Sequence, residues 1–397
     1  MGGGFCARRL NRLSHLLRGS VERGEIAGAV ALLARQNEVH VVTEGTMRLG
    51  GGPAMERDTI FRIASMTKPI AAVAAMMLVE ETTLRLDAPI EKWLPELATR
   101  KVLRSMESAP DDTVPAKRSI TLRDILTMRW GIGATMAPAG TYPIQKIISD
   151  LDIGPHPMPP PFAPDELMGR YHDLPLMHQP GEKWMYHNAY DILGVVIARA
   201  TRMRLEDFLA QRIFDPLGMR DTAFTVPNSK ADRLATCYHH DGTKLDVFPE
   251  GRGGQSSRGK MFPSGSTGLV STVDDYLAFG RMMLDFGAHD SARLLARPTV
   301  EVMTADHITE GQKAISPFFP GFWDNHGYGF GISTITRRDG VSMVPGRFGW
   351  DGGFGTTWSS DPQERLVTIL LLQRMFDETV INLHADFYTL AYQAIDD

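Results

Sequence analysis

The sequence predicts an α+β fold, in which an antiparallel sheet is built from both ends of the chain around a mostly helical middle. Near the N-terminus, two apolar runs at 27–36 and 39–46 flank Gln36–Asn37–Glu38 and are typical of a β-hairpin. Four short β-rich runs separated by turn residues come late in the chain, at 328–338, 346–353, 355–362 and 365–374. Strands at both ends of a chain, with helices between them, indicate one sheet assembled from both termini.

Helical patterns account for much of the rest. Apolar residues at helical spacing predict a helix over 5–21, with Gly24 as its stop, and another over 378–394 closes the chain. The segments 87–97 and 119–128 also read as helices, and no strong strand signal occurs between Asp87 and about Asp221. The stretch 136–179 is rich in proline and methionine, and a loop of that length is expected to be a functional wall or an insert.

These elements predict two interlocking domains. Residues 1–84 and 232–397 are expected to form an α/β domain, and residues 85–231 a mostly helical one. The active site then belongs in the cleft between them.

Composition excludes several classes of function. With 43% hydrophobic and 22% charged residues and a net charge of −5, the chain has no basic footprint for nucleic acid or anionic membrane. Its two cysteines, Cys6 and Cys237, indicate neither a disulfide framework nor a cysteine zinc site. Histidines are scattered without metal-ligand spacing, so no metal and no cofactor are expected. The N-terminus lacks a signal-peptide core and no run spans a bilayer, which favours a cytoplasmic location.

The segment Phe61 to Glu80 is the centre of the chain. From Ile70 to Val79 it is apolar on every side, which is typical of a helix buried in a large core. Ser65 and Lys68 lie three residues apart at its N-terminal end and so share a face. A hydroxyl beside an amine at the positive end of a helix dipole is a candidate nucleophile with its base.

Ser-x-x-Lys is a short motif, and this chain contains it twice. Ser257 and Lys260 match it as well, within the glycine-rich run GRGGQSSRGK. A run of that composition cannot hold two side chains in a fixed geometry, so this copy is interpreted as a solvated loop.

Tyr186 and Asn188 form the only Tyr-x-Asn in the chain. A tyrosine beside a lysine ammonium is expected to have its pKa depressed and to serve as base and then acid. Asn188 is expected to hydrogen-bond Lys68 and a bound acyl group, although a packed aromatic before a capped helix explains the pair equally well. Further on, the glycines of FGWDGGFG (348–355) indicate a close approach to the backbone. If a substrate carbonyl lies there, the N–H groups of Gly353 and Ser65 would form an oxyanion hole; a β-bulge without function is the alternative.

Together these segments resemble the class C β-lactamase-like serine hydrolases, and within them the family VIII carboxylesterases. LDAPIEKWLPEL, ITLRDILT, QPGEKWMYHNAYDILGVVI, IFDPLGMRDTAF, GSTGLVSTVDDYLAFGRMML, YGFGIS and GWDGGFGTTWSSDP follow that family's order over nearly the whole chain. The resemblance implies a β-lactamase/transpeptidase-like fold and a short-chain neutral ester as substrate. It implies Ser65 as acyl-accepting nucleophile, Lys68 as its charge partner and Tyr186 as general base and acid, with Asn188 binding substrate.

Two motifs depart from the family's pattern. Where β-lactamases carry Lys-Thr-Gly and many esterases His-x-Gly, this chain has Trp350-Asp351-Gly352, as in the tryptophan-bearing esterase branch. We expect all three residues to contact substrate, with Trp350 offering an apolar wall and Asp351 repelling anions. After Leu126-Thr127 the family often has His-Thr-Ser-Gly, whereas residues 128–131 of this chain are MRWG. The family pattern therefore does not indicate how this segment packs beneath the site.

Other functions remain open at this point. A β-lactamase, a D-alanyl peptidase or an acyltransferase would use the same residues, although cell-wall enzymes should be exported. A non-catalytic binding module on the same fold is less favoured, because Ser65, Lys68 and Tyr186 are all intact. An α/β-hydrolase is excluded by the lack of Gly-x-Ser-x-Gly. The sequence does not indicate the natural ester or the oligomeric state.

Overall fold

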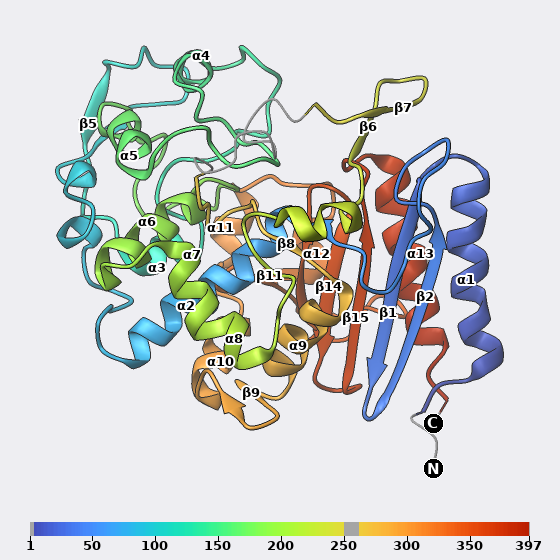
Figure 1. Ribbon diagram of the computed structural model, residues 1–397. Coiled ribbons are helices and arrows are strands. Elements are labelled where there is room, and N and C mark those ends of the chain that lie inside the picture. Colours follow the sequence, from blue (N-terminus) through green and yellow to red (C-terminus); the bar gives the residue numbers. More distant parts are fainter. Residues whose placement is uncertain (1–3, 250–261, 397) are drawn as a thin grey trace.

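A seven-stranded antiparallel sheet forms the centre of the computed structural model, which describes residues 4–249 and 262–396 (Figure 1). Its strand order is β11-β12-β13-β14-β15-β1-β2. The strands are β1 (Gly28–Arg35), β2 (Glu38–Gly45), β11 (His326–Tyr328), β12 (Ser333–Ile335), β13 (Phe348–Gly352), β14 (Thr356–Asp361) and β15 (Leu366–Leu372). The N-terminal hairpin β1-β2 pairs with the C-terminal strand β15, with Ala31 opposite Leu370, which confirms the predicted sheet from both termini.

Helices cover both faces of this sheet. Helices α1 (Ala7–Glu22) and α13 (Glu378–Gln393) lie together on one face (Figure 1), where Leu13 and Phe387 pack with the alternate β1 residues Ala31 and Leu33. On the opposite face, α2 (Thr67–Glu80) and α9 (Val273–Leu284) share the main core with Val30 and Leu32 of β1. Because β1 is buried on both faces, its sequence is continuously apolar rather than alternating.

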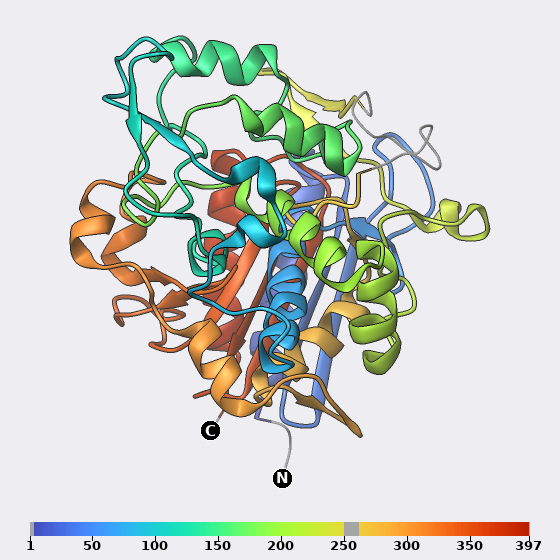
Figure 2. The same ribbon diagram turned by 90° about the vertical axis from the view of Figure 1, so that its left-hand side faces the viewer.

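Helix α2 confirms the predicted central helix. Every residue from Thr67 to Leu78 is buried, and in Figure 2 this helix lies in front of the sheet. Pro69 falls in its first turn, where a missing N–H costs no intrahelical hydrogen bond. Ser65 lies just outside α2, in a 3-10 turn over Ala64–Met66.

The middle of the chain is mostly helical. It contains α3 (Leu122–Leu126), α4 (Pro143–Asp150), α5 (Pro164–His172), α6 (Ala189–Thr201), α7 (Leu205–Leu209) and α8 (Asp215–Leu217). The predicted helix over 87–97 is wrong in detail: this segment forms two 3-10 turns, Ile90–Lys92 and Pro95–Leu97, because Pro95 interrupts a longer helix. A hairpin of β4 (Lys101–Leu103) and β5 (Thr113–Pro115) was not predicted. The division of the chain into two domains at about residues 84 and 232 stays a prediction.

The predicted strand over 328–338 is two strands. Gly331 has a φ of 72°, and the turn there separates β11 from β12. Strand β12 pairs with β13 only through Ser333 and Thr334, so the edge of β13 from Trp350 to Gly352 has no partner in β12.

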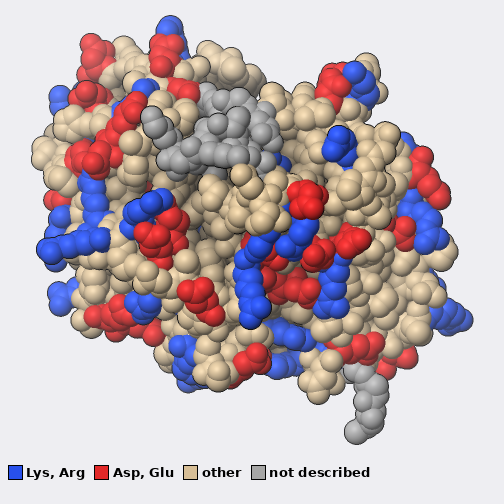
Figure 3. All heavy atoms as spheres, viewed as in Figure 1, with Lys and Arg blue, Asp and Glu red and all other residues tan. Residues whose placement is uncertain are grey.

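Smaller elements complete the described part of the chain. They are β3 (Phe61–Arg62), β6 (Tyr238–His240), β7 (Leu245–Val247), β8 (Val270–Ser271), β9 (Ala288–His289), β10 (Ala292–Arg293), α10 (Arg297–Thr304), α11 (Glu310–Ala314) and α12 (Phe322–Asn325). Acidic and basic side chains are interspersed over the face in Figure 3. Among the described residues, no helix is both long and apolar enough to cross a bilayer.

Candidate active site

Ser65 is held by a strained and closely packed backbone. Ala64, directly before it, has a φ of 43°, a conformation that residues with a Cβ rarely adopt. Thr356 Oγ1 on β14 donates a hydrogen bond of 3.2 Å to the carbonyl of Ile63, and Tyr276 OH on α9 donates one of 2.8 Å to the carbonyl of Met66. Strain of this kind persists only where surrounding structure enforces it, and it is common at active sites.

Lys68 contacts Ser65 directly, as the sequence predicts. Its Nζ lies 2.8 Å from Ser65 Oγ and 2.9 Å from the carbonyl oxygen of Ser266. Ser65 is 6% exposed and Lys68 is fully buried. Burial lowers the pKa of Lys68 to about 7, and the negative charge of Asp191 opposes this decrease. Near neutral pH, much of this amine is therefore uncharged and able to accept a proton.

Tyr186 completes the constellation, but its ionisation differs from the prediction. Lys68 Nζ lies 4.8 Å from the centroid of its ring, and Trp350 Nε1 donates a hydrogen bond of 3.1 Å to its hydroxyl. Burial raises the pKa of Tyr186, and hydrogen bonding with Ser65 and Trp350 only lessens the rise. The predicted depression of this pKa is wrong, because loss of solvent around the phenol outweighs the nearby lysine. The group poised to take a proton is Lys68.

Asn188 does not make the predicted contact with Lys68. It is buried, and its Nδ2 donates hydrogen bonds to the carbonyl of Ile153 (2.5 Å) and to Tyr171 OH (2.9 Å). It precedes α6 without a side-chain capping bond. Asn188 Oδ1 has no hydrogen-bond partner in the described structure. In this arrangement Asn188 ties α6 to the 136–179 segment.

The glycines after Trp350 have two different neighbourhoods. A Cβ on Gly352 would lie 2.3 Å from the carbonyl oxygen of Ile63, so glycine is required where β13 contacts the backbone leading to Ser65. At Gly352, therefore, the group that lies close to the backbone, as the sequence indicated, is the chain itself at Ile63. A Cβ on Gly353 would have only Pro157 nearby, at 3.4 Å. Asp351 is exposed, and its Oδ1 accepts a hydrogen bond of 2.5 Å from Thr357 Oγ1.

Sequence reasoning missed the polar groups behind Lys68. Asp191 on α6 is 3% exposed and accepts a short hydrogen bond from Ser264 Oγ. Ser264 Oγ also accepts the N–H of Ser266, whose carbonyl binds Lys68. Burial raises the pKa of Asp191 to about 6, while Ser264 and the charge of Lys68 act in the opposite direction. The signal available in the sequence was Asp191 itself, an acid on an otherwise apolar helix three residues after Asn188.

Most of the candidate residues, but not Lys68 or Asn188, line one large cavity. It has a volume of about 590 Å³ and is lined by Ser65, Tyr186, Trp350, Asp351, Gly352 and Gly353, among others. Met136 and Pro155–Pro157 from the 136–179 stretch form part of its wall, as do Phe318, Phe319 and Phe322. Other methionines of this part of the chain, Met168, Met177 and Met185, are buried in the core.

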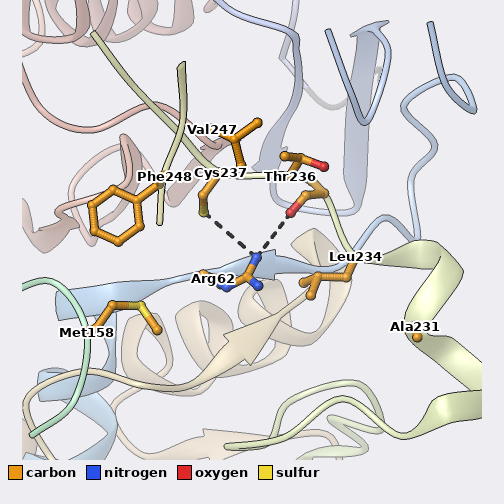
Figure 4. A pocket seen from close by; sticks show the side chains of 9 residues that line it. Arg62, Met158, Ala231, Leu234, Thr236, Cys237, Val247 and Phe248 are labelled. Atoms are coloured by element: carbon orange, nitrogen blue, oxygen red, sulfur yellow. Dashed lines mark hydrogen bonds between the residues drawn. The ribbon is translucent and has the colours of Figure 1, made fainter. Parts of the chain in front are cut away.

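A second, smaller cavity of about 170 Å³ contains none of the predicted site residues (Figure 4). Arg62 lines it and donates a hydrogen bond of 3.2 Å to the carbonyl of Ala235. Its guanidinium also lies 3.9 Å from Cys237 Sγ. The other Ser-x-x-Lys pair, Ser257 and Lys260, lies outside the described residues.

Comparison with known proteins now identifies the family. The sequence profile of the family described as Beta-lactamase matches residues 13–392. The chain belongs to the beta-lactamase family. It is 35% identical over 370 residues to Protein Rv1367c from Mycobacterium tuberculosis (90% of this chain, 88% of the relative). It is 29% identical over 389 residues to Esterase EstB from Burkholderia gladioli (92% and 91%). The solved structure of EstCE1, described as a hydrolase with promiscuous acyltransferase activity, superposes with a TM-score of 0.77 at 23% identity (98% and 99%).

The beta-lactamase-like fold and the serine hydrolase class predicted from the sequence are thereby confirmed. The departure from the family's pattern at residues 128–131 also has a structural counterpart. Trp130 is fully buried, and its ring packs edge-on against Tyr171 with centroids 5.3 Å apart. Tyr171 is the residue whose hydroxyl binds Asn188. The altered motif therefore packs against the partner of Asn188.

Proposed function

We propose that this serine hydrolase is a carboxylesterase of the family VIII branch, which hydrolyses short-chain esters that are neutral around the scissile bond. The observation that carries the proposal is the buried Lys68 amine, which has a pKa lowered to about 7 and lies 2.8 Å from the Oγ of Ser65, a residue that lines an apolar cavity. A lysine in that state is a general base at neutral pH.

Acylation uses the three residues in named roles. Ser65 Oγ attacks the ester carbonyl carbon as its proton passes to Lys68 Nζ, which gives a tetrahedral intermediate. The N–H groups of Ser65 and Gly353 are our candidates for stabilising its oxyanion. As the bond to the alcohol oxygen breaks, Tyr186 donates its phenolic proton to that oxygen, and the proton on Lys68 restores the phenol. The products are an acyl-Ser65 ester and a free alcohol.

Deacylation repeats these steps with water as the nucleophile. Lys68 and Tyr186 together accept a proton from water as it attacks the acyl carbonyl, and that proton returns to Ser65 Oγ as the acid leaves. Trp350 orients Tyr186 for both half-reactions, because its indole N–H holds the phenol oxygen at 3.1 Å.

The third motif supports an ester rather than a β-lactam. A β-lactam carries a carboxylate beside its scissile amide, and a lysine in this motif attracts it. This chain offers the flat apolar face of Trp350 and the exposed carboxylate of Asp351. The name of the relative EstB supports the same choice. EstCE1's description favours transfer of the acyl group to an alcohol as a second activity of the same site.

A panel of substrates tests this proposal. We expect kcat/KM for p-nitrophenyl butyrate to exceed that for nitrocefin by at least about two decades, or ~2.7 kcal/mol of transition-state stabilisation. Trp350→Lys should narrow this ratio, although it also removes the hydrogen bond to Tyr186 and should lower both rates. Comparable rates on the two substrates by the wild type would overturn the esterase assignment in favour of a β-lactamase.

A further inference from the structure

The large cavity continues past the catalytic residues to a buried arginine that the proposed mechanism does not use. Arg347 directly precedes β13 and lines this cavity together with Ile335, Met343, Ala385 and Tyr388. The last two belong to α13, so this branch lies between β13 and that helix. Strand β12 pairs with β13 only as far as Gly349, so the cavity can pass around the open edge at Trp350–Gly352.

Among the described residues, no carboxylate lies within ion-pair distance of the buried Arg347 guanidinium. The residue is 5% exposed, and its Nη1 has no hydrogen-bond partner in the described structure. Its Nη2 lies 3.8 Å from the sulfur of Met343, and its Cζ lies 4.4 Å from the ring centroid of Tyr388 and 5.9 Å from that of Tyr392. Arginine stays ionised in proteins, and buried charges are almost always paired, because desolvating an unpaired one costs several kcal/mol.

The acidic groups near this branch accept hydrogen bonds from residues other than Arg347. Asp361 accepts hydrogen bonds from Tyr392 OH and from the backbone N–H of Gln363. Asp351 accepts one from Thr357, and Asp339 is held by Asn325. His326 also lines the cavity, and burial together with the charge of Arg347 lowers its pKa to about 4, so it is neutral and no counter-ion.

We propose that Arg347 binds a carboxylate at the far end of the ester substrate. A carboxylate matches the two-pronged donor geometry of guanidinium, and the apolar side chains around Arg347 suit a methylene chain. The inference rests on the proposed ester hydrolysis and adds a class of substrate to it: half-esters of dicarboxylic acids, or ω-hydroxy acids whose hydroxyl group is acylated and whose carboxylate is free. Short neutral esters would occupy only the part of the cavity near Ser65.

The geometry also indicates a chain length. Arg347 lies three residues before Trp350, so the two residues are ~10 Å apart along the strand at about 3.3 Å per residue and their side chains leave opposite faces of β13. Because three extended backbone bonds span about 3.3–3.6 Å, a chain that passes around the strand edge needs at least about nine bonds. Asp351 follows Trp350 and lies on the same face of β13 as Arg347, where its carboxylate bonds Thr357. A chain of this length would bring a terminal carboxylate to Arg347.

Matched substrates test the proposal. We expect the wild type to hydrolyse the mono-p-nitrophenyl ester of decanedioic acid at least about tenfold more efficiently (kcat/KM) than p-nitrophenyl decanoate. Arg347→Gln should remove this advantage and leave p-nitrophenyl butyrate within about twofold of wild type, while Arg347→Lys should keep part of it. Arg337→Gln makes the same charge change at an exposed arginine paired with Asp339, and should keep the full advantage. The butyrate ester of 10-hydroxydecanoic acid, in which the ω-hydroxyl is acylated and the carboxylate is free, tests a carboxylate on the alcohol part instead of the acyl group, and its hydrolysis can be followed by proton release.

Binding measured without turnover separates this inference from the esterase proposal. Decanoate should raise the melting temperature of the wild type, and of Arg337→Gln, more than the neutral decan-1-ol does, and Arg347→Gln should lose the difference. No preference for the compound with the free carboxylate in either assay, or an equal loss of activity on charged and neutral esters in Arg347→Gln, would overturn the carboxylate site. Absence of all ester hydrolysis with decanoate binding intact would instead overturn the proposed function and keep the site.

Discussion

Two buried lysines in this protein have opposite electrostatic environments. Lys68 on α2 is fully buried and bonds two neutral oxygens, of Ser65 and Ser266. Lys313 on α11 is 8% exposed and bonds two carboxylates, Asp306 at 2.8 Å and Glu310 at 2.9 Å. Burial lowers the pKa of both amines, but at Lys313 the two carboxylates outweigh it and the pKa is raised.

The difference shows that burial alone does not make a lysine a base. In the described structure, no carboxylate lies within ion-pair distance of Lys68, and the nearest acidic influence is Asp191 behind Ser264. Lys68 is therefore available for proton transfer, whereas Lys313 is committed to its ion pairs. The following predictions test this contrast, from the largest expected effect to the smallest.

Removal of the hydroxyl beside Lys68 should have the largest effect. Ser65→Ala should lower kcat on p-nitrophenyl butyrate by at least about three decades, as expected for loss of a catalytic nucleophile. The matched change beside the other lysine, Glu310→Gln, should leave kcat within about twofold. Substantial hydrolysis of p-nitrophenyl butyrate by Ser65→Ala would contradict the assignment of Ser65 as the nucleophile.

Tyr186→Phe tests whether the residue over Lys68 moves a proton or only packs. The substitution keeps the ring that lies 4.8 Å from Lys68 Nζ and removes the hydroxyl that Trp350 binds. We expect kcat to fall by more than about tenfold with little change in melting temperature. If the variant keeps more than about a tenth of wild-type kcat, Tyr186 has a packing role and another acid must be sought.

The acidic limb of the pH–rate profile should report Lys68. Because the neutral amine is the base and its pKa is lowered to about 7, kcat should rise as pH increases through about 7. Asp191 favours the charged amine, so Asp191→Asn should lower the pKa of Lys68 and move this limb to lower pH, by on the order of one unit. Asp275→Asn is the control. This acid on α9 is also buried, but it accepts its hydrogen bond from Thr222, which is not a candidate site residue. If the acidic limb of Asp191→Asn stays in place or moves to higher pH, Asp191 does not raise the pKa of Lys68.

Lys313 should matter for stability alone. Lys313→Met leaves Asp306 without its cation, and we expect a loss of about 1–2 kcal/mol in the free energy of unfolding, measured by urea denaturation. The kcat of the folded variant should stay within about twofold of wild type. A loss of kcat in Lys313→Met without a loss of stability would contradict the claim that Lys313 has a structural role only.

Much of the fold was predictable because its signals are local. The hairpin β1-β2, the strands β13 to β15 and the buried helix α2 follow from runs of apolar residues and the turns between them. The split of β11 from β12, and the 3-10 turns within 87–97, depend on how single glycines and prolines are placed, which a pattern does not resolve. The short strands β4 and β5 are stabilised by pairing with each other and carry little pattern of their own.

The site was predictable in its residues but not in its electrostatics. Ser65, Lys68, Tyr186 and Trp350 come together as expected. The direction of the Tyr186 pKa depends on burial, which a sequence does not reveal, so the prediction was wrong. The hydrogen bond of Asn188 to Tyr171, and the lack of a partner for Arg347 Nη1 among the described residues, were not predictable because both depend on residues distant in the chain.

The identity and activation of the nucleophile can be measured directly with a p-nitrophenyl phosphonate ester. The release of p-nitrophenol gives the inactivation rate, and mass spectrometry of the digested protein locates the adduct. A single adduct on the peptide that contains Ser65, formed at a rate that rises with pH through about 7, is the predicted result. An adduct at Ser257, or a rate that does not change across this pH range, would contradict the claim that buried Lys68 activates Ser65.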